Sequence, residues 1–257
     1  MKTRILSALL FMTLLIPCNA SAMTTDELSD AFSKYSKPLE KLYGNNDIKK
    51  LIGECKKLLK KNEDPKAQFI GWTYLAHAYA KQGDKEKTLE AVEKFSAFDD
   101  ENAMAPVIST VPLLRIGEDQ NNVLNTCLKA AQNHEGEFRE EMEQLCKDTV
   151  ANFNKVSASK LWNAFDENEI AAEDAYKGKL VAVSGVVSNI STSVTGNPEI
   201  TMNVDPYGMK TISFEFSRED RPKLARLKKG KKITIAGRCQ GFVMGMSVCF
   251  TSCWILD

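Results

Sequence analysis

KLVAVSGVVSNIS, residues 179–191, is the longest of several strand-like segments in the second half of the chain and indicates its class of fold. Apolar residues recur along it at every second position, which is typical of a β-strand. Four more runs of this kind follow, and a charged segment of helical character, Glu219–Lys228, separates the third run from the fourth. The five predicted strands are Lys179–Ser191, Pro198–Asp205, Lys210–Ser217, Lys232–Phe242 and Met246–Leu256.

Three strands, a helix and two more strands follow one another in the order of the OB-fold, a five-stranded β-barrel. Gly185 in the first strand suits the sharp bend that such a barrel requires. A leading helix precedes the strands, and its predicted apolar face consists of Leu161, Trp162, Phe165 and Ile170. We therefore expect an OB-fold domain with a leading helix over residues 157–257.

Particular residues of this region also resemble a known family. They are Asn168-Glu169, Ala172, Tyr176-Lys177-Gly178-Lys179, Val183, Gly185, Val187, Phe214 to Phe216, Leu224, Leu227-Lys228-Lys229-Gly230, Gly237, Cys239 and Cys253. With them, residues 157–257 resemble the tRNA-anticodon-like OB family of exported bacterial proteins. The resemblance implies a fold rather than an activity. By the family's pattern, Cys239 would pair with Cys253.

Cys249 leaves that pairing open. A three-residue turn at Val243–Gly245 would set Cys239 opposite Cys249 in the last two strands, which makes Cys249 an alternative partner.

The first half of the chain has the pattern of packed helices. Between Thr25 and Phe153 apolar residues recur every three or four positions, with turn signals at 44–46, 62–65, 83–84 and 135–136. Within it, Phe69–Glu101 resembles a tetratricopeptide repeat through Trp72, Leu75, Ala76, Tyr79 and Gly83, although Thr88 and Asp100 depart from that pattern. The predicted fold class is α+β multidomain, with helical-hairpin repeats over residues 23–156 before the barrel.

The N-terminus indicates export. Lys2 and Arg4 precede an apolar run, Ile5–Ile16, and Ala20-Ser21-Ala22 is typical of a signal peptidase site. We predict a signal peptide over residues 1–22, a periplasmic location and no transmembrane segment in the mature chain. The protein could instead be secreted, or anchored by a lipid on Cys18, although Pro17 occupies a position where such sites favour a small residue.

Six of the seven cysteines lie after the predicted cleavage site, and an oxidising compartment favours disulfides. Cys127 and Cys146 lie nearly equidistant from the turn at 135–137, so an antiparallel helical hairpin would bring them together. Cys55 lies on an apolar helical stripe and is interpreted as a small buried hydrophobe. The chain has no CxxC pair and two histidines, so we predict no metal and no cofactor.

The expected function is binding without catalysis. His77 and His134 fall in the helical half, no phosphate loop or GxSxG turn occurs, and Lys plus Arg equal Asp plus Glu at 34 each. A candidate surface for an anionic ligand contains Lys228, Lys229, Lys231 and Lys232, but the outward positions of the second and third strands offer no aromatic residues for stacked bases.

The first hypothesis is therefore an exported protein that binds a protein or envelope partner through a helical groove, the barrel, or both. The alternative is an OB-type module for an oligonucleotide or oligosaccharide, with nucleic acid less favoured. A third hypothesis is a purely structural barrel that caps the helices.

Overall fold

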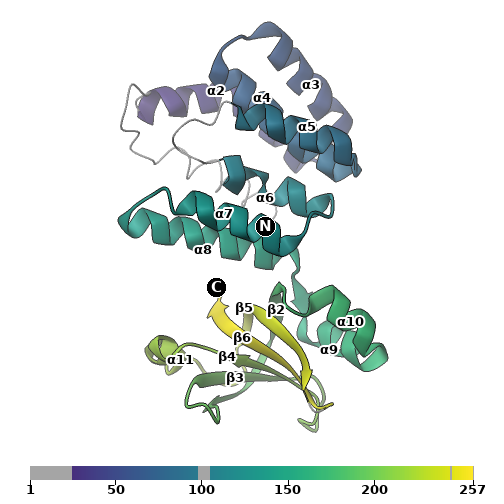
Figure 1. Ribbon diagram of the computed structural model, residues 1–257, viewed down its shortest axis with the longest axis vertical. Helices are drawn as coiled ribbons and strands as arrows, with labels where there is room; N and C mark the ends of the chain where they lie inside the picture. The colour runs from purple at the N-terminus through teal and green to yellow at the C-terminus, as the bar shows by residue number, and fades with distance from the viewer. Residues whose placement is uncertain (1–24, 98–104, 244, 257) are drawn as a thin grey trace. The chain divides into compact units, whose positions relative to one another are not determined.

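The computed structural model describes residues 25–97, 105–243 and 245–256, and the chain divides into two compact units, Met1–Thr149 and Val150–Asp257 (Figure 1). The division falls inside helix α8 (Gly136–Phe153), a little before the boundary predicted at 156/157. The predicted signal peptide and Cys18 lie outside the described residues. Among the residues described, no helix combines the length and the apolar character that crossing a membrane would require.

The first unit is helical. Its helices are α2 (Thr25–Gly44), α3 (Ile48–Lys61), α4 (Pro65–Gln82), α5 (Lys85–Ser96), α6 (Ala105–Arg115), α7 (Gln120–Ala131) and most of α8. Aspartates begin four of them, because the side chains of Asp47, Asp64, Asp84 and Asp119 accept hydrogen bonds from backbone N–H groups of the first turn. The predicted turns at 44–46, 62–65 and 83–84 are the places where these helices end.

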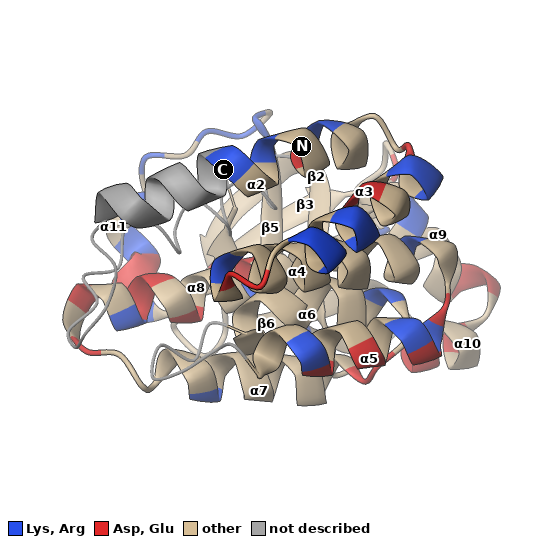
Figure 2. Ribbon diagram, turned by 90° about the horizontal axis from the view of Figure 1, so that it is seen from above, with Lys and Arg blue, Asp and Glu red and all other residues tan. Residues whose placement is uncertain are grey.

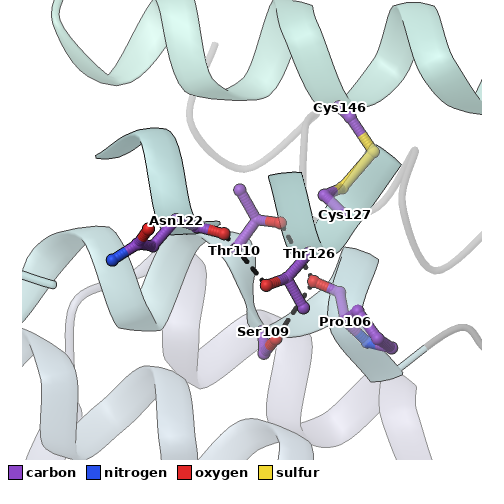
Figure 3. The surroundings of a disulfide bond; sticks show 7 residues. All are labelled: Pro106, Ser109, Thr110, Asn122, Thr126, Cys127 and Cys146. Carbon is purple, nitrogen blue, oxygen red and sulfur yellow. Dashed lines mark hydrogen bonds between the residues drawn. A yellow bond between two sulfur atoms is a disulfide. The ribbon is translucent and has the colours of Figure 1, made fainter. Parts of the chain in front are cut away.

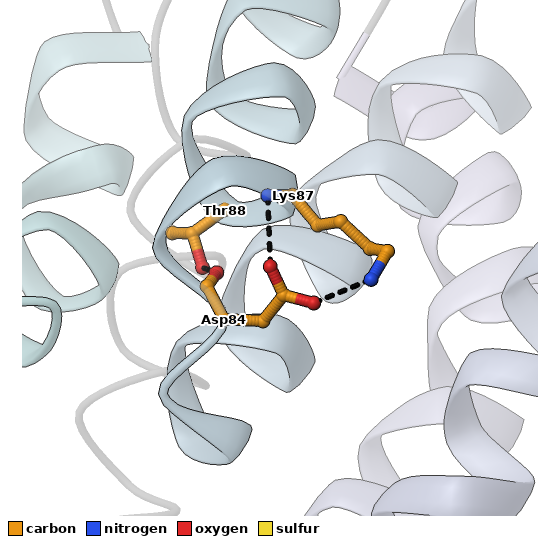
Figure 4. A network of polar contacts seen from close by, with 3 residues as sticks. All are labelled: Asp84, Lys87 and Thr88. Carbon is orange, nitrogen blue, oxygen red and sulfur yellow. Dashed lines mark hydrogen bonds and ion pairs between the residues drawn. The ribbon is translucent and has the colours of Figure 1, made fainter.

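The start of α5 shows why Thr88 is accommodated where a tetratricopeptide repeat usually has alanine. The Thr88 hydroxyl is buried, and it donates to the carbonyl oxygen of Asp84 at 2.6 Å (Figure 4). The Asp84 carboxylate accepts from the backbone N–H of Lys87 at 3.1 Å and pairs with the Lys87 ammonium. A polar residue therefore fits this packed position, and the likeness to tetratricopeptide repeats stays a prediction.

Helix α4 is the centre of this unit. It packs against α2, α3, α5 and α6, and nearly every residue from Thr73 to Ala80 is buried. Gly71 lets α3 approach closely, because a Cβ atom there would lie 2.7 Å from the Leu59 Cδ2 atom. Residues 73–80 of α4 therefore present almost no surface to solvent.

The second unit begins with the last residues of α8, which are followed by β1 (Val156–Ser157), α9 (Ala158–Glu167) and α10 (Glu169–Tyr176). The predicted leading helix is thus two helices, because Asn168 is extended and its side chain caps α10 by accepting from the Ala171 N–H at 3.1 Å. Leu161, Trp162 and Phe165 are buried as expected. Ile170 lies beyond the break, is 78% exposed, and was wrongly predicted to share their apolar face.

Five strands close a β-barrel, which confirms the predicted OB-type fold. They are β2 (Leu180–Thr192), β3 (Pro198–Asn203), β4 (Thr211–Glu215), β5 (Lys232–Val243) and β6 (Ser247–Ile255). β4 and β6 run parallel, the other neighbours run antiparallel, and β2 pairs with β5 to complete the closure. The irregularity in β2 falls between Val187 and Asn189, not at Gly185, where a side chain would collide with the Met202 sulfur.

The barrel interior contains the apolar alternation of the strands. Its central residues include Ile200, Met202, Ile212, Phe214, Val248 and Phe250. The helical part of the segment between β4 and β5 is shorter than predicted. It consists of a 3-10 turn at Arg218–Asp220 and the short helix α11 (Arg221–Leu224). Leu224 is buried there, whereas the basic residues around it stay exposed, so little apolar surface is available to extend the helix.

Candidate binding surfaces

The outward face of β3, β4 and β6 is polar. Its exposed or half-buried positions are Glu199, Thr201, Asn203, Thr211, Ser213, Glu215, Ser247, Cys249 and Thr251. This is the face where OB-folds that bind nucleic acid present aromatic side chains for stacking. The described outward positions of β3 and β4 have hydroxyl, amide and carboxyl groups but no aromatic ring, as the strand alternation predicts. Strand β6 adds the Cys249 thiol and, near its end, the half-buried Trp254.

Two carboxylates lie at one end of this face. Glu199 and Glu215 are directly opposite in the β3–β4 pair, and Glu215 also accepts from the Asn197 amide at 2.7 Å. Partial burial, followed by the charge of Glu215, raises the pKa of Glu199. A negative charge at this place repels phosphates, so the polar face is a poor surface for a nucleic acid backbone.

The predicted basic surface lies apart from these strands along the sequence. Lys228, Lys229, Lys231 and Lys232 are all exposed, and they surround the turn at Gly230 between α11 and β5. The turn is fixed to β2, because Gly230 donates to the Val187 carbonyl at 2.8 Å and Val187 donates back to the Lys231 carbonyl at 3.0 Å. The four ammonium groups are therefore held on an ordered backbone and can attract an anion.

One end of the barrel exposes large apolar side chains that the sequence pattern did not predict. Tyr207 and Met209 in the β3–β4 turn are 87% and 74% exposed, and Met246 and Val243 near the β5–β6 turn are 60% and 43% exposed. The two turns are joined, since the Thr211 N–H donates to the Met246 carbonyl at 3.3 Å. We call Tyr207, Met209, Val243 and Met246 the apolar end. Its signal in the sequence was the presence of large apolar residues in predicted turns, where polar residues are usual.

The β3–β4 turn that presents this end is well ordered by hydrogen bonds. Both carboxylate oxygens of Asp205 accept from the backbone, one from Tyr207 N–H at 3.2 Å and the other from Lys210 N–H at 2.7 Å. The Lys210 ammonium lies 4.1 Å from the centre of the buried Trp162 ring and pairs with Asp166 at 3.2 Å. The β3–β4 turn, which carries Tyr207 and Met209, is thus held in one backbone conformation.

Cys127 and Cys146 form a disulfide between α7 and α8, with their Cα atoms 5.9 Å apart (Figure 3). Both residues are fully buried in the helical unit. The pairing is the one that the helical-hairpin argument predicts. Cys55, interpreted as a small buried hydrophobe, is a buried free thiol in α3.

The three C-terminal cysteines are thiols in the structure. Cys239 lies opposite Phe250, and Cys249 lies opposite Gly241, so the register argument for a Cys239–Cys249 bridge is wrong. The observed register differs from the predicted one for two reasons. Val243 still pairs with Ser247 before the turn begins, and the register shifts between Cys239 and Gly241. The Cys239–Cys253 pairing stays a prediction from family resemblance. Burial raises the pKa of Cys239 to about 11, which keeps its thiol uncharged.

His77 and His134 both lie in the helical unit, and no cluster of three or more metal-ligating side chains occurs among residues 25–97, 105–243 and 245–256. His77 is fully buried in α4.

A family model described as tRNA_anti-like matches residues 70–253, well over half of the chain. The chain belongs to the tRNA_anti-like family. For this tRNA_anti-like protein the match begins inside α4, so it extends far into the helical unit, beyond the region of residues 157–257 that carries the sequence resemblance. No curated protein matches the chain at a significant level.

Among solved structures, one similar chain is described as a "putative nucleic acid-binding lipoprotein" from Klebsiella pneumoniae subsp. pneumoniae. It is 21% identical, and the match covers 48% of this chain and 100% of that chain, with a TM-score of 0.36.

Proposed function

We propose that this tRNA_anti-like protein is a non-enzymatic, exported binding protein, and that its barrel contacts a protein or envelope partner through the apolar end. The observation that carries the proposal is the exposure of Tyr207, Met209, Val243 and Met246 on two hydrogen-bonded turns. Isolated apolar residues are normal on protein surfaces, but a contiguous group is typical of an interaction site.

The chemistry of the apolar end favours a protein partner. Tyrosine and methionine are enriched in protein interfaces, and methionine side chains adapt to irregular apolar surfaces. Lys210 in the same turn is held by Asp166, so the end is mainly apolar with a charged edge. An apolar segment of a partner protein fits this combination better than a polyanion does.

Crosslinking in intact cells with an amine-reactive reagent tests this proposal, because Lys210 lies in the β3–β4 turn itself. We expect crosslinks from Lys210 to one defined partner. Lys228 and Lys229, on the turn before β5, are the matched internal control. Crosslinks to other proteins from these control lysines alone, with none from Lys210, would show that the apolar end is not the contact surface.

A second candidate function, an OB-type module for an oligonucleotide, is favoured by the four exposed lysines around Gly230. Titration with labelled single-stranded DNA tests it. Binding that weakens steeply with salt, and that is lost on reversing the charges of Lys228, Lys229, Lys231 and Lys232, would support this candidate. The polar face, with its Thr, Ser and Asn side chains, is the corresponding surface to test with envelope oligosaccharides.

A further inference from the structure

Helix α3 has a basic face that the balanced charge of the whole chain conceals. Six of its fourteen residues are lysines, and all six are exposed. They occupy two adjacent helical rows, Lys49, Lys56 and Lys60 in one row and Lys50, Lys57 and Lys61 in the other. The opposite side of α3 packs inward through the fully buried Leu51 and Cys55. A 3.6-residue period thus directs the lysines to solvent along the length of the helix.

Helix α2, which packs against α3, adds to this charge. Lys34, Lys37 and Lys41 are exposed and lie at three- and four-residue spacing on α2. Figure 2 shows lysine positions along both helices. Between residues 34 and 61 the sequence has nine lysines, no arginine and three acidic residues, Glu40, Asp47 and Glu54, which gives a formal charge of nine minus three, or +6. We call the nine lysines the lysine face.

The composition of the lysine face favours a diffuse anionic surface over nucleic acid. Lysine is a compact point charge, whereas arginine is the side chain suited to bidentate recognition of phosphates and bases. Base stacking requires exposed aromatic rings, but Tyr43 is buried and Tyr35 is half-buried with its hydroxyl directed to Asp64 at 3.4 Å. The face therefore provides charge without a means of reading bases.

The neighbouring sequence indicates which anionic surface lies within reach. Eight residues, 17–24, separate the apolar run Ile5–Ile16 from the start of α2. Fully extended, they span roughly 26 Å at about 3.3 Å per residue. Until the predicted cleavage after Ala22, the apolar run would hold α2 and α3 near the headgroups of a bilayer, and in the lipid-anchored alternative a lipid on Cys18 would do so permanently. After cleavage, the charge of the lysine face is the remaining attraction to such a surface. Basic residues beside a membrane segment are attracted to anionic lipids.

We propose that the lysine face docks on the surface of a membrane that contains anionic phospholipids. The interaction is electrostatic and lies in the helical unit, so it goes beyond the barrel contact under "Proposed function" and does not depend on it. The membrane would hold the helical unit at its surface while the apolar end of the barrel contacts its own partner.

Vesicle sedimentation of the full chain tests this proposal. The vesicles contain either phosphatidylcholine alone or phosphatidylcholine with phosphatidylglycerol, and the neutral vesicles report any binding by the apolar N-terminal run. We expect the chain to bind the anionic vesicles at least about tenfold more tightly than the neutral vesicles. This preference should fall steeply as the salt concentration is raised.

Two variants locate the surface. Replacing Lys49, Lys50, Lys56, Lys57, Lys60 and Lys61 of α3 by Gln should abolish the preference for anionic vesicles, and these exposed changes are nearly neutral for helix propensity, so circular dichroism should be unchanged. The matched control, with Lys228, Lys229, Lys231 and Lys232 replaced by Gln, should retain the preference.

Three results would overturn the proposal. The first is that the variant with the α3 changes still prefers anionic vesicles. The second is that the unmodified chain shows no preference for anionic vesicles. The third is binding of single-stranded DNA that the α3 changes remove while vesicle binding is unaffected, which would assign the face to nucleic acid.

Discussion

His77 is a buried imidazole whose environment opposes protonation. It is fully buried in α4, its ring meets Tyr43 edge-on with centroids 5.8 Å apart, and the nearby Ile108 backbone opposes the lowering of its pKa only in part. Burial, followed by the charges of Arg115 and Lys81, lowers the pKa of His77 to about 3. The folded protein therefore holds this imidazole neutral at pH values where the unfolded chain protonates it.

We predict that His77→Leu reduces the acid sensitivity of the helical unit. Below the unfolded pKa of about 6.5, only the unfolded chain binds this proton, so native stability falls by about 1.4 kcal/mol per pH unit until the folded pKa is reached. Leucine abolishes this contribution. Urea unfolding at pH 7.5, 6 and 5 measures it, and identical pH dependence in both proteins would contradict the account.

Single residues show where prediction from sequence fails. The apolar alternation of β3 and β4 identifies Ile200, Met202 and Phe214 as interior because the strand period fixes the direction of each side chain. Ile170 was misplaced, since a single capping residue, Asn168, ends one helix and starts another. The burial of His77 could not be predicted, because it depends on four helices that pack around α4 and that the sequence of α4 does not reveal.

Strands β5 and β6 are closely packed at Gly237. A Cβ atom there would lie 2.6 Å from the Cys253 sulfur and 3.2 Å from the Thr251 carbonyl oxygen. The nearby register shift leaves Ser252 with a positive φ of 51° and directs Cys253 inward. Glycine at 237 is thus required by packing between two strands, beyond any local turn preference.

We expect Gly237→Ala to lower the free energy of unfolding of the barrel by about 1–3 kcal/mol, because the new methyl group overfills the site. Gly53→Ala in α3 is the matched control. A Cβ atom there meets nothing within 4 Å, and alanine should stabilise the helix by about 1 kcal/mol. Denaturant melts of both variants compare the effects, and a neutral or stabilising Gly237→Ala would refute the packing argument.

The disulfide joins two helices that are close in sequence. Replacing both Cys127 and Cys146 by Ser should destabilise the helical unit by about 3 kcal/mol, since the bond closes a loop with a sequence separation of 19. Cys249→Ser, at a half-buried free thiol, should change stability little. Urea unfolding under non-reducing conditions measures the loss; an equal effect of the two changes would be inconsistent with a stabilising bridge.

At the level of elements, the strands and most helix ends could be predicted because they depend on local periodicity and capping. The register of the last hairpin could not, because it depends on a bulge and on the pairing of Val243 with Ser247. The apolar end also escaped prediction. Its residues come from two turns separated by more than thirty positions, and only the parallel pairing of β4 with β6 brings those turns together.

At the scale of the whole molecule, different surfaces have different proposed roles. The outward strand face of the barrel is polar with two opposed glutamates, the apolar end is the proposed protein contact, and the lysine face of α2 and α3 is the proposed membrane contact. The order of helices and strands along the chain was predictable, and so was the lack of a base-stacking platform on β3 and β4. Which surface binds a partner depends on exposure, which the sequence pattern alone does not reveal.

The central claim is that the apolar end binds a protein partner. The most direct test measures how much of the partner that crosslinks to Lys210 co-purifies from cells. Its recovery with the unmodified chain is compared with its recovery with the triple variant Tyr207→Ser, Met209→Ser, Met246→Ser. The account predicts a loss of about tenfold or more for this variant, because its changes remove the exposed side chains that anchor the contact. The matched control, Thr201→Ala with Ser213→Ala on the polar face, should retain the partner. Equal recovery with the apolar-end variant and with the unmodified chain would contradict the claim.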